Sequence, residues 1–166
     1  MVTQKKIIIH ENNKYLEFQS KGNASQFAIP FAKHLCIGKG YDIGYCKEAW
    51  KFPDAIGIDL KNDSNYHAMN LPDVQVDYIY SSHCLEHLES WIEAIEYWTT
   101  KIKKNGVLFL YLPHYSQTYW RPWNNKKHRH IIESIHVKDL LIHLKYKEIF
   151  ISGVDLNNSF MAVVYK

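Results

Sequence analysis

The sequence predicts an α/β fold built on a mostly parallel β-sheet. Residues 107–112 are almost unbroken in apolarity, which is typical of a strand buried on both faces of such a sheet. A second apolar run, at 76–80, precedes a stretch over 88–102 whose apolar residues recur at helical spacing. Strand, helix and strand in this order are typical of a parallel crossover.

Other segments add elements on both sides of this unit. Apolar runs at 41–43 and 55–58 predict two more strands, and 24–35 has helical spacing with the helix proper expected to begin near Pro30. The helix over 88–102 has acids in its first half and lysines at its end. The pair Asn105-Gly106 predicts its C-terminal stop.

The chain ends in a predicted helix over 137–146 and strands at 148–151 and 159–165, which a short turn joins into an antiparallel hairpin at the sheet edge. Residues 45–54 are too few for a full crossover helix. We therefore expect a three-layer α-β-α arrangement with fewer helices on one side. Residues 1–166 form one domain in this interpretation, with an accessory N-terminal hairpin over 1–22.

Composition narrows the class of protein. With 46% hydrophobic and 22% charged residues among 166, the chain is globular rather than disordered or fibrous. The net charge of +3 is too small to indicate nucleic-acid binding by overall electrostatics. Three cysteines without close pairing favour a reducing, cytoplasmic location, and no apolar run reaches membrane-spanning length.

A glycine-rich run and an acid mark a ligand site. Gly38, Gly40 and Gly44 surround the first predicted strand of the sheet, and Asp59 with Leu60 follows the second. Glycines at such a turn let a ligand approach the backbone, and a carboxylate after the next strand can accept hydrogen bonds from both ribose hydroxyls. The pattern predicts a nucleoside-bearing cofactor.

Several motifs in order resemble one family. The chain contains Gly-Tyr-Asp-Ile-Gly at 40–44, Ile-Asp at 58–59, Leu-Pro at 71–72, the block 76–87, Lys-Asn-Gly at 104–106 and Leu-Tyr-Leu-Pro at 110–113. This set resembles class I S-adenosylmethionine-dependent methyltransferases over about residues 36–166, and most of all small members associated with sugar and surface-polysaccharide biosynthesis. The resemblance implies the Rossmann-like fold of that class and S-adenosylmethionine as cofactor, with S-adenosylhomocysteine as product.

The resemblance also implies roles for single residues. Gly40, Asp42 and Gly44 match the motif against which the methionine part of the cofactor lies, and Asp59 matches the acid that holds the ribose. Ser81 and Ser82 match the end of the family's fourth strand, which is the run at 76–80 here and lies beneath the sulfonium. His83 lies at the mouth where a substrate enters.

The sequence also departs from the family. Cys46 stands where relatives usually have a further glycine, and either His67 or Asn70 stands near the place of an acid that faces the adenine amino group. These changes keep open the interpretation of a non-catalytic partner subunit that retains the fold.

Methyl transfer to a hydroxyl needs a proton acceptor, and the candidates are His83, His87 and His114. His83 is favoured, because it lies at a strand end, where α/β sheets bind ligands. His83, Glu86 and His87 have the i, i+3, i+4 spacing of one helical face. Three interpretations stay open: a base oriented by the carboxylate, a divalent metal site of the kind seen in some quinone-type relatives, or the first turn of a structural helix. The metal is the least favoured.

The segment 113–135 follows the strand predicted at 107–112 and combines aromatic rings with cations. We expect it to bind the methyl acceptor as a substrate-side loop, through Tyr115, Tyr119, Trp120, Arg121, Lys127, His128, Arg129 and His130. This composition favours a small, anionic, ring-containing acceptor such as a nucleotide-linked or glycan sugar. A solvated basic loop is the alternative.

Three function classes follow. The favoured one is methylation of a hydroxyl or amine on such an acceptor. The second is an RNA or nucleotide methyltransferase, because basic residues interleaved with aromatics also suit single strands, although no long basic face is present. The third is the non-catalytic partner subunit. A homodimer is compatible with each of them.

Overall fold

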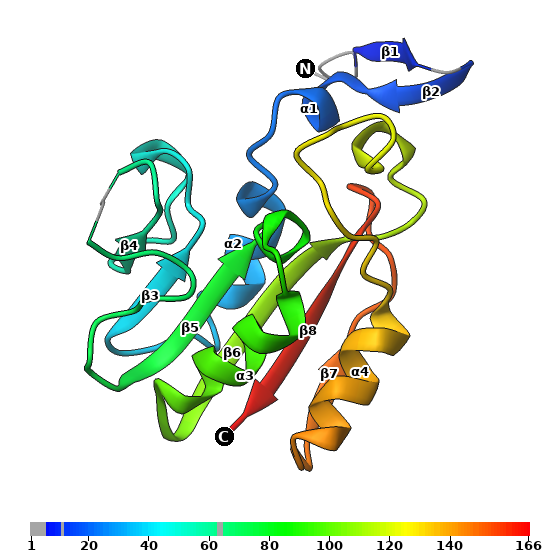
Figure 1. Ribbon diagram of the computed structural model, residues 1–166. Coiled ribbons are helices and arrows are strands. Elements are labelled where there is room, and N and C mark those ends of the chain that lie inside the picture. The colour runs from blue at the N-terminus through cyan, green and yellow to red at the C-terminus, as the bar shows by residue number, and fades with distance from the viewer. Residues whose placement is uncertain (1–5, 11, 63–64) are drawn as a thin grey trace.

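The fold is a six-stranded mixed sheet between helices (Figure 1). The computed structural model describes residues 6–10, 12–62 and 65–166, so Glu11 of the predicted N-terminal turn lies outside the described residues. The strands are β3 (Gly40–Ile43), β4 (Ile56–Ile58), β5 (Val76–Ser82), β6 (Ile102–Pro113), β7 (Ile149–Ile151) and β8 (Ser159–Tyr165).

The sheet order is β4-β3-β5-β6-β8-β7. The first four of these strands pair in parallel, whereas β8 is antiparallel to both β6 and β7. The predicted fold class, a mostly parallel Rossmann-like sheet with an antiparallel C-terminal hairpin, is confirmed. The hairpin strand β8 lies inside the sheet, and β7 forms the edge.

Helices cover the two faces unequally. On one face, α3 (Trp91–Thr100) and α4 (Ser134–His143) bury Ile95, Trp98 and Leu141 against the sheet. On the other face, α2 (Ser25–Ala32) fully buries only the small side chains of Ser25, Ala28 and Ala32, while Phe27 and Ile29 are partly buried there. The thinner second layer was expected from the short connection after β3. Among the described residues, no helix has the length and apolarity that crossing a membrane requires.

A separate two-stranded hairpin precedes the sheet. Strands β1 (Ile7–His10) and β2 (Asn13–Leu16) pair antiparallel and lead into α1 (Glu17–Ser20). The Tyr119 ring packs against the rings of His10 and Tyr15, at centroid distances of 5.0 and 6.2 Å. The hairpin therefore rests on the loop that follows β6.

The connection between β3 and β4 contains one three-residue 3-10 helix, η1 (Glu48–Trp50). Two contacts attach it to the sheet. The backbone N–H of Phe52 donates to Asp42 Oδ2 at 2.6 Å, and the Phe52 ring packs on Tyr78 and Tyr80. A buried carboxylate and one aromatic ring thus cover a part of the sheet where a longer crossover would place a helix.

The predicted helix over 88–102 is shorter in the structure. It begins at Trp91, capped by the Ser90 hydroxyl, and ends at Thr100. Ile102 is fully buried as the first residue of β6, opposite Val76, because its side chain fills the sheet core. The predicted stop signal instead lies within β6, where the pairing register with β5 shifts and a Cβ on Gly106 would come within 2.6 Å of a backbone oxygen.

Two other helix boundaries also differ. Helix α2 begins at Ser25, so Pro30 lies inside it rather than near its start. The proline removes one backbone hydrogen bond, and α2 ends two residues later. Helix α4 begins at Ser134, three residues earlier than predicted, because Glu133 and His136 form a reciprocal capping box.

Burial raises the pKa of Asp42 to about 7, well above the value of an unfolded chain. The folded state therefore holds a proton that the unfolded state releases. This contribution to stability is complete below about pH 4 and is lost as pH rises through about 7. We expect the free energy of unfolding of the wild type, relative to Asp42→Asn, to fall by about 2 kcal/mol between about pH 5 and pH 8.

Urea denaturation at the two pH values measures this difference, in which the titration of other groups cancels. Asp54→Asn is the matched control, because Asp54 is an exposed acid of the same connection. Wild type and Asp42→Asn curves that shift together with pH would show that Asp42 is ionised in the folded state.

Candidate functional site

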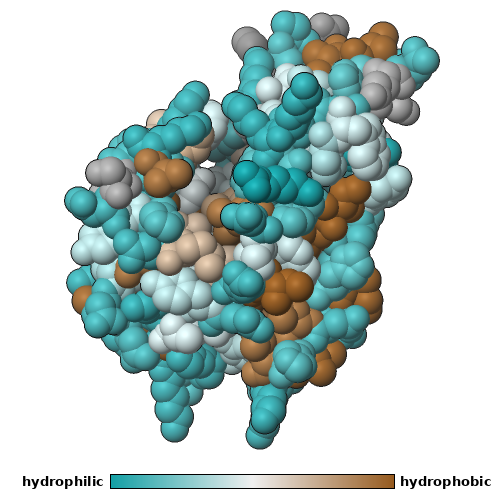
Figure 2. Space-filling model, in the orientation of Figure 1, coloured by the Kyte–Doolittle hydropathy of each residue, from teal (hydrophilic) through white to brown (hydrophobic). Residues whose placement is uncertain are grey.

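The carboxyl ends of β3, β4 and β5 meet at one edge of the sheet. Ile43 pairs with both Ile58 and Ser81, so the three strands end level with one another. The chain passes from β3 to β4 on one side and later returns to β5 on the other. Ligands of open α/β sheets bind outside such a reversal point. Figure 2 shows the surface indented there, between the connection after β3 and the N-terminal hairpin with the loop after β6.

Gly44 follows β3 at this edge, with φ of 83°. A Cβ at this position would lie 2.6 Å from Cys84, so only glycine fits. The Ser81 hydroxyl donates to the Ile43 carbonyl at 2.9 Å and ties the two strand ends together. The hydroxyls of Ser82 and Tyr80 are buried, with no hydrogen-bond partner among the described residues. The Tyr80 ring is packed between Phe52 and Phe109 in the core, so Ser82, the last residue of β5, is the one of the two that can offer a hydrogen bond to a ligand at the edge.

Asp59 follows β4 and is half-buried. Its Oδ2 accepts the backbone N–H of Cys46 at 3.0 Å, and its Oδ1 accepts that of Lys61 at 2.9 Å. A carboxylate oxygen has two lone pairs, so each can accept a further hydrogen bond from a ligand hydroxyl. Leu60, next to it, exposes 70% of its surface at the same edge.

Three residues of the glycine-rich run do not face this edge. Gly38 and Gly40 lie at the amino end of β3, against Asp77 and Tyr78, and Gly40 is roughly 13 Å along the strand from Gly44. Asp42 is buried under η1. The structure therefore separates Gly38 and Gly40 from the other predicted cofactor residues, and their absent side chains instead make room for Asp77 and Tyr78.

Asn70 lies in an exposed loop after β4. Its backbone pairs with that of His67, and its amide donates to the Asn65 carbonyl at 2.8 Å. His67 Nδ1 in turn accepts the backbone N–H of Met69. Both candidates for the adenine contact therefore help to close the loop itself.

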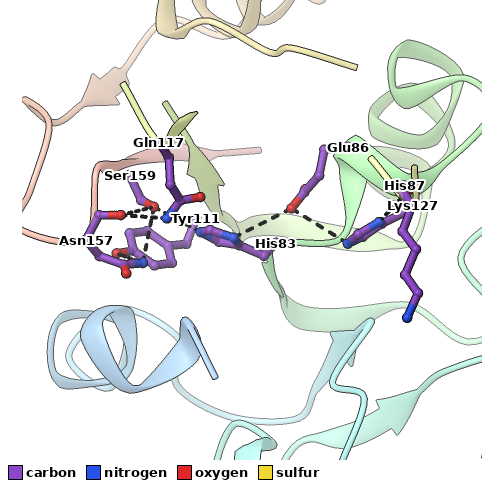
Figure 3. A network of polar contacts seen from close by, with 8 residues as sticks. All are labelled: His83, Glu86, His87, Tyr111, Gln117, Lys127, Asn157 and Ser159. Atoms are coloured by element: carbon purple, nitrogen blue, oxygen red, sulfur yellow. Dashed lines mark hydrogen bonds and ion pairs between the residues drawn. The ribbon is translucent and has the colours of Figure 1, made fainter. Parts of the chain in front are cut away.

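The 3-10 helix η2 (Leu85–His87) follows β5 and places the Glu86 carboxylate between two histidines (Figure 3). Glu86 Oε1 lies 3.6 Å from His83 Nδ1 and 3.9 Å from His87 Nε2, too far for hydrogen bonds. Burial raises the pKa of Glu86 to about 7. The predicted grouping of these three side chains is thus present, on a short 3-10 turn rather than an α-helix.

His83 faces the end of β8 rather than an open mouth. Its Nε2 lies 3.0 Å from Ser159 Oγ, and its side chain is 15% exposed. Asn157 Nδ2 donates to the hydroxyls of Tyr111 and Ser159, and the Gln117 amide donates to the Asn157 carbonyl (Figure 3). Burial lowers the pKa of His83 to about 3, so the ring is neutral.

The loop after β6 forms a cleft of about 20 Å³, which has room for one water molecule. Of the predicted catalytic and substrate residues, the structure brings together His114, Tyr115, Trp120, Arg121, His128 and His130. The Arg121 guanidinium stacks over the Tyr115 ring at 3.9 Å, and Trp120 stacks on His128. A ring-sized ligand requires this loop to move.

The remaining predicted substrate residues lie elsewhere. Tyr119, in η3 (Thr118–Trp120), packs on the N-terminal hairpin, and Lys127 and Arg129 point to the exposed surface.

Sequence reasoning did not identify two polar partners. Glu133 Oε2 lies 3.2 Å from His114 Nε2, although 19 residues separate them in the chain. Tyr111 donates to Asp155 at 2.5 Å, so the predicted turn before β8 also closes the network around His83. The one signal for the second contact is a tyrosine within an otherwise apolar strand.

The sequence matches the family described as a methyltransferase domain over residues 22–144, which is most of the chain. The chain belongs to the methyltransferase domain family. It is a class I S-adenosylmethionine-dependent methyltransferase, and S-adenosylmethionine is its cofactor. No curated protein matches the sequence.

Solved structures of low identity share the fold of this methyltransferase. An S-adenosylmethionine-dependent methyltransferase from Archaeoglobus fulgidus aligns with a TM-score of 0.64 at 15% identity, over 90% of this chain and 98% of its own. A possible histamine N-methyltransferase from Thermotoga maritima has a TM-score of 0.66 at 13% identity, over 89% and 91%. The N-methyltransferase NodS from Bradyrhizobium japonicum, bound to S-adenosylhomocysteine, aligns with a TM-score of 0.57 at 14% identity. The alignment covers 90% of this chain and 87% of NodS.

The edge of the sheet fits the cofactor of this methyltransferase. Gly44 leaves no side chain at the reversal point, Asp59 has lone pairs for a diol, and Ser82 has a buried hydroxyl without a partner. Cys46, at the place of the family's further glycine, has φ of 63°, a left-handed conformation that favours glycine. The methyltransferase thus keeps the backbone shape of the glycine motif with a side chain present.

This conformation costs a residue with a Cβ about 1 kcal/mol or more. We expect Cys46→Gly to raise the free energy of unfolding by about 1 kcal/mol, because the strain is relieved while the backbone N–H still donates to Asp59. Thermal and urea denaturation measure the change. Cys46→Ala removes the thiol and keeps the strain, so an equal gain in that variant would attribute the effect to the sulfur instead.

Proposed function

We propose that this methyltransferase methylates a hydroxyl or amine of a small, anionic acceptor, such as a nucleotide-linked or glycan sugar. The observation that carries the proposal is the cleft of the loop after β6. Arg121, His114, His128 and His130 line it together with Tyr115 and Trp120. A guanidinium pairs with phosphate or carboxylate, and aromatic rings pack on the faces of sugars and bases.

The cofactor is proposed to lie at the edge formed by β3, β4 and β5. Gly44 and Cys46 offer backbone to its methionine part, Asp59 and Leu60 face its ribose and adenine, and the end of β5 lies beneath its sulfonium. Ser81 acts there by tying β5 to β3, and Ser82 by its buried hydroxyl. When bound, S-adenosylmethionine supplies a methyl group on a positively charged sulfur.

His114 is the proposed proton acceptor for the methylated hydroxyl. Its Nε2–H donates to Glu133, a tautomer assigned from that partner. Nδ1 is then the proton-accepting nitrogen. It accepts the Ser116 backbone N–H at 3.1 Å and lies 2.9 Å from the Ser116 hydroxyl, so the loop movement that admits the acceptor must also release Nδ1 from Ser116. Glu133 is then a positioning residue that orients the ring. The His83 side chain is less accessible than that of His114, and its Nε2 faces Ser159 at the end of β8, whereas His114 lines the cleft.

Other properties of the chain stay predictions. We propose one domain over residues 1–166, with the hairpin over 1–22 as an accessory and 113–135 as the substrate-side loop. All three cysteines are free thiols, which supports a cytoplasmic location. A homodimer or a partner chain is supported by an apolar groove of about 860 Å³ between α2 and β7, with Phe31 and Phe150 exposed beside it.

The acceptor class is tested by measuring S-adenosylhomocysteine formation with nucleoside diphosphate sugars, neutral sugars and a short RNA. We expect turnover with the anionic sugars and at least tenfold lower kcat/KM with the neutral ones, because a charge-assisted hydrogen bond contributes about 1.5 kcal/mol or more. Turnover with RNA alone, lost as salt rises, would contradict the sugar acceptor and support nucleic acid.

Two variants divide binding from chemistry in the same assay. Arg121→Gln is expected to raise the KM for the acceptor about tenfold with kcat nearly unchanged. His114→Gln is expected to lower kcat about 100-fold with little change in KM. A fall in kcat with His83→Gln and not with His114→Gln would transfer the proton-accepting role to His83.

Asp59→Ala is expected to weaken the binding of S-adenosylmethionine at least tenfold, because two hydrogen bonds to the ribose are lost. Isothermal titration calorimetry in the presence of a chelator measures this affinity. Lys61→Ala is the matched control, since Lys61 contacts Asp59 through its backbone N–H alone. Equal affinity in wild type and Asp59→Ala would remove Asp59 from the cofactor site.

A further inference from the structure

The Glu86 carboxylate is the least satisfied charged group among the described residues. Its side chain is fully buried, and neither oxygen has a hydrogen-bond partner within 6–10, 12–62 and 65–166. A buried carboxylate without partners is costly, so structures retain one where a cation or proton compensates it.

Of the two histidines beside Glu86, His87 cannot donate a proton to it through the nitrogen that faces it. His87 Nδ1 lies 2.8 Å from the Lys127 carbonyl, which only accepts, so Nδ1 carries the hydrogen and Nε2 has a lone pair. That Nε2 faces Glu86 Oε1 at 3.9 Å (Figure 3). Two acceptors therefore face each other. A histidine held by a backbone carbonyl on its other nitrogen is also the usual arrangement of a metal ligand.

A third donor comes from the loop after β6. The buried His128 packs edge-on against the His87 ring, with centroids 4.5 Å apart, and Trp120 stacks on its other side. One ligand atom each from Glu86, His87 and His128 lie within 4.8 Å of one another. Two imidazoles and one carboxylate are a ligand set of zinc sites that keep a fourth position open.

We propose that Glu86, His87 and His128 bind one divalent transition-metal ion, for which Zn²⁺ is the best match. Tetrahedral ligation needs donor atoms roughly 3.3 Å apart, so the ion would draw the three side chains together by about 1 Å. It would join η2 to the loop that lines the acceptor cleft. Its open position would be available to an oxygen of a ligand there.

The surrounding backbone already holds these residues in place. The Glu86 carbonyl accepts the N–H groups of Arg129 and His130, at 2.7 and 3.3 Å, and His130 Nε2 lies 2.8 Å from the Leu88 carbonyl. Residues 127–130 of the loop are thus held against η2, by the Lys127 carbonyl before His128 and by these N–H groups after it. The ligand geometry therefore does not depend on an unattached segment.

Equilibrium dialysis of the full chain against Zn²⁺, with the bound metal counted by mass spectrometry, tests the site. We expect one Zn²⁺ per chain, bound at least 100-fold more weakly in Glu86→Gln and His128→Ala. His143→Ala should bind as the wild type, because His143 is an exposed histidine on α4. Co²⁺ in place of Zn²⁺ should give the intense visible absorption of a four-coordinate ion.

Absence of Zn²⁺ binding in the wild type above that of the denatured chain would overturn the site, and would identify a proton as the cation that compensates Glu86. Binding that survives both variants would also overturn it and assign the metal to surface histidines. If Glu86→Gln does not fold, His128→Ala decides. Cofactor affinity measured with a chelator is independent of the metal, so failure here and failure of the proposed function are distinguishable.

Discussion

The pairing of β3 with β5 is the constraint on which the site depends. These strands are far apart in sequence, yet Ile43 lies opposite Ser81 and accepts a hydrogen bond from its hydroxyl. Gly44 can then pass Cys84 with no room for a Cβ. This contact fixes where the two strands end, and with them the edge at which a cofactor can meet backbone groups directly. A shift of this register would move every group of that edge.

The thin second layer of the fold leaves two unfavourable features at the connection between β3 and β4: a buried acid and a residue in a left-handed conformation. Twelve residues, 44–55, connect β3 to β4, and one 3-10 helix, a buried acid and one phenylalanine ring replace a crossover helix. The buried acid is neutral over part of the physiological pH range because of its raised pKa. In the same connection, Cys46 has a left-handed conformation, and its N–H donates to Asp59. Both features lower the free energy of unfolding, and both lie next to the edge formed by β3, β4 and β5.

The strands were predictable because burial on both faces leaves a continuous apolar run, as in residues 107–112. The ends of the elements were not predictable. Ile102 fits the apolar stripe of a helix and a strand equally well, and only its burial opposite Val76 assigns it to β6. The acid after β4 was placed correctly at the edge, since parallel strands end together. Gly38 and Gly40 were predicted at this edge but lie at the other end of β3. In a sequence, a glycine needed for packing at the amino end of a strand cannot be told from one needed by a ligand.

The side of the site proposed for the acceptor is formed by side-chain and loop contacts rather than by strand pairing. Its polar groups meet through contacts between residues that are remote in the chain, such as His114 with Glu133 and His87 with the Lys127 carbonyl. No periodicity records such contacts. The sheet determines the cofactor edge through strand pairing, whereas η2 determines the position of the loop through the backbone carbonyl of Glu86. Within residues 6–10, 12–62 and 65–166, the carboxylate of that same residue has no hydrogen-bond partner. Glu86 thus holds the loop through its backbone carbonyl, while its carboxylate is available to bind a cation or a proton.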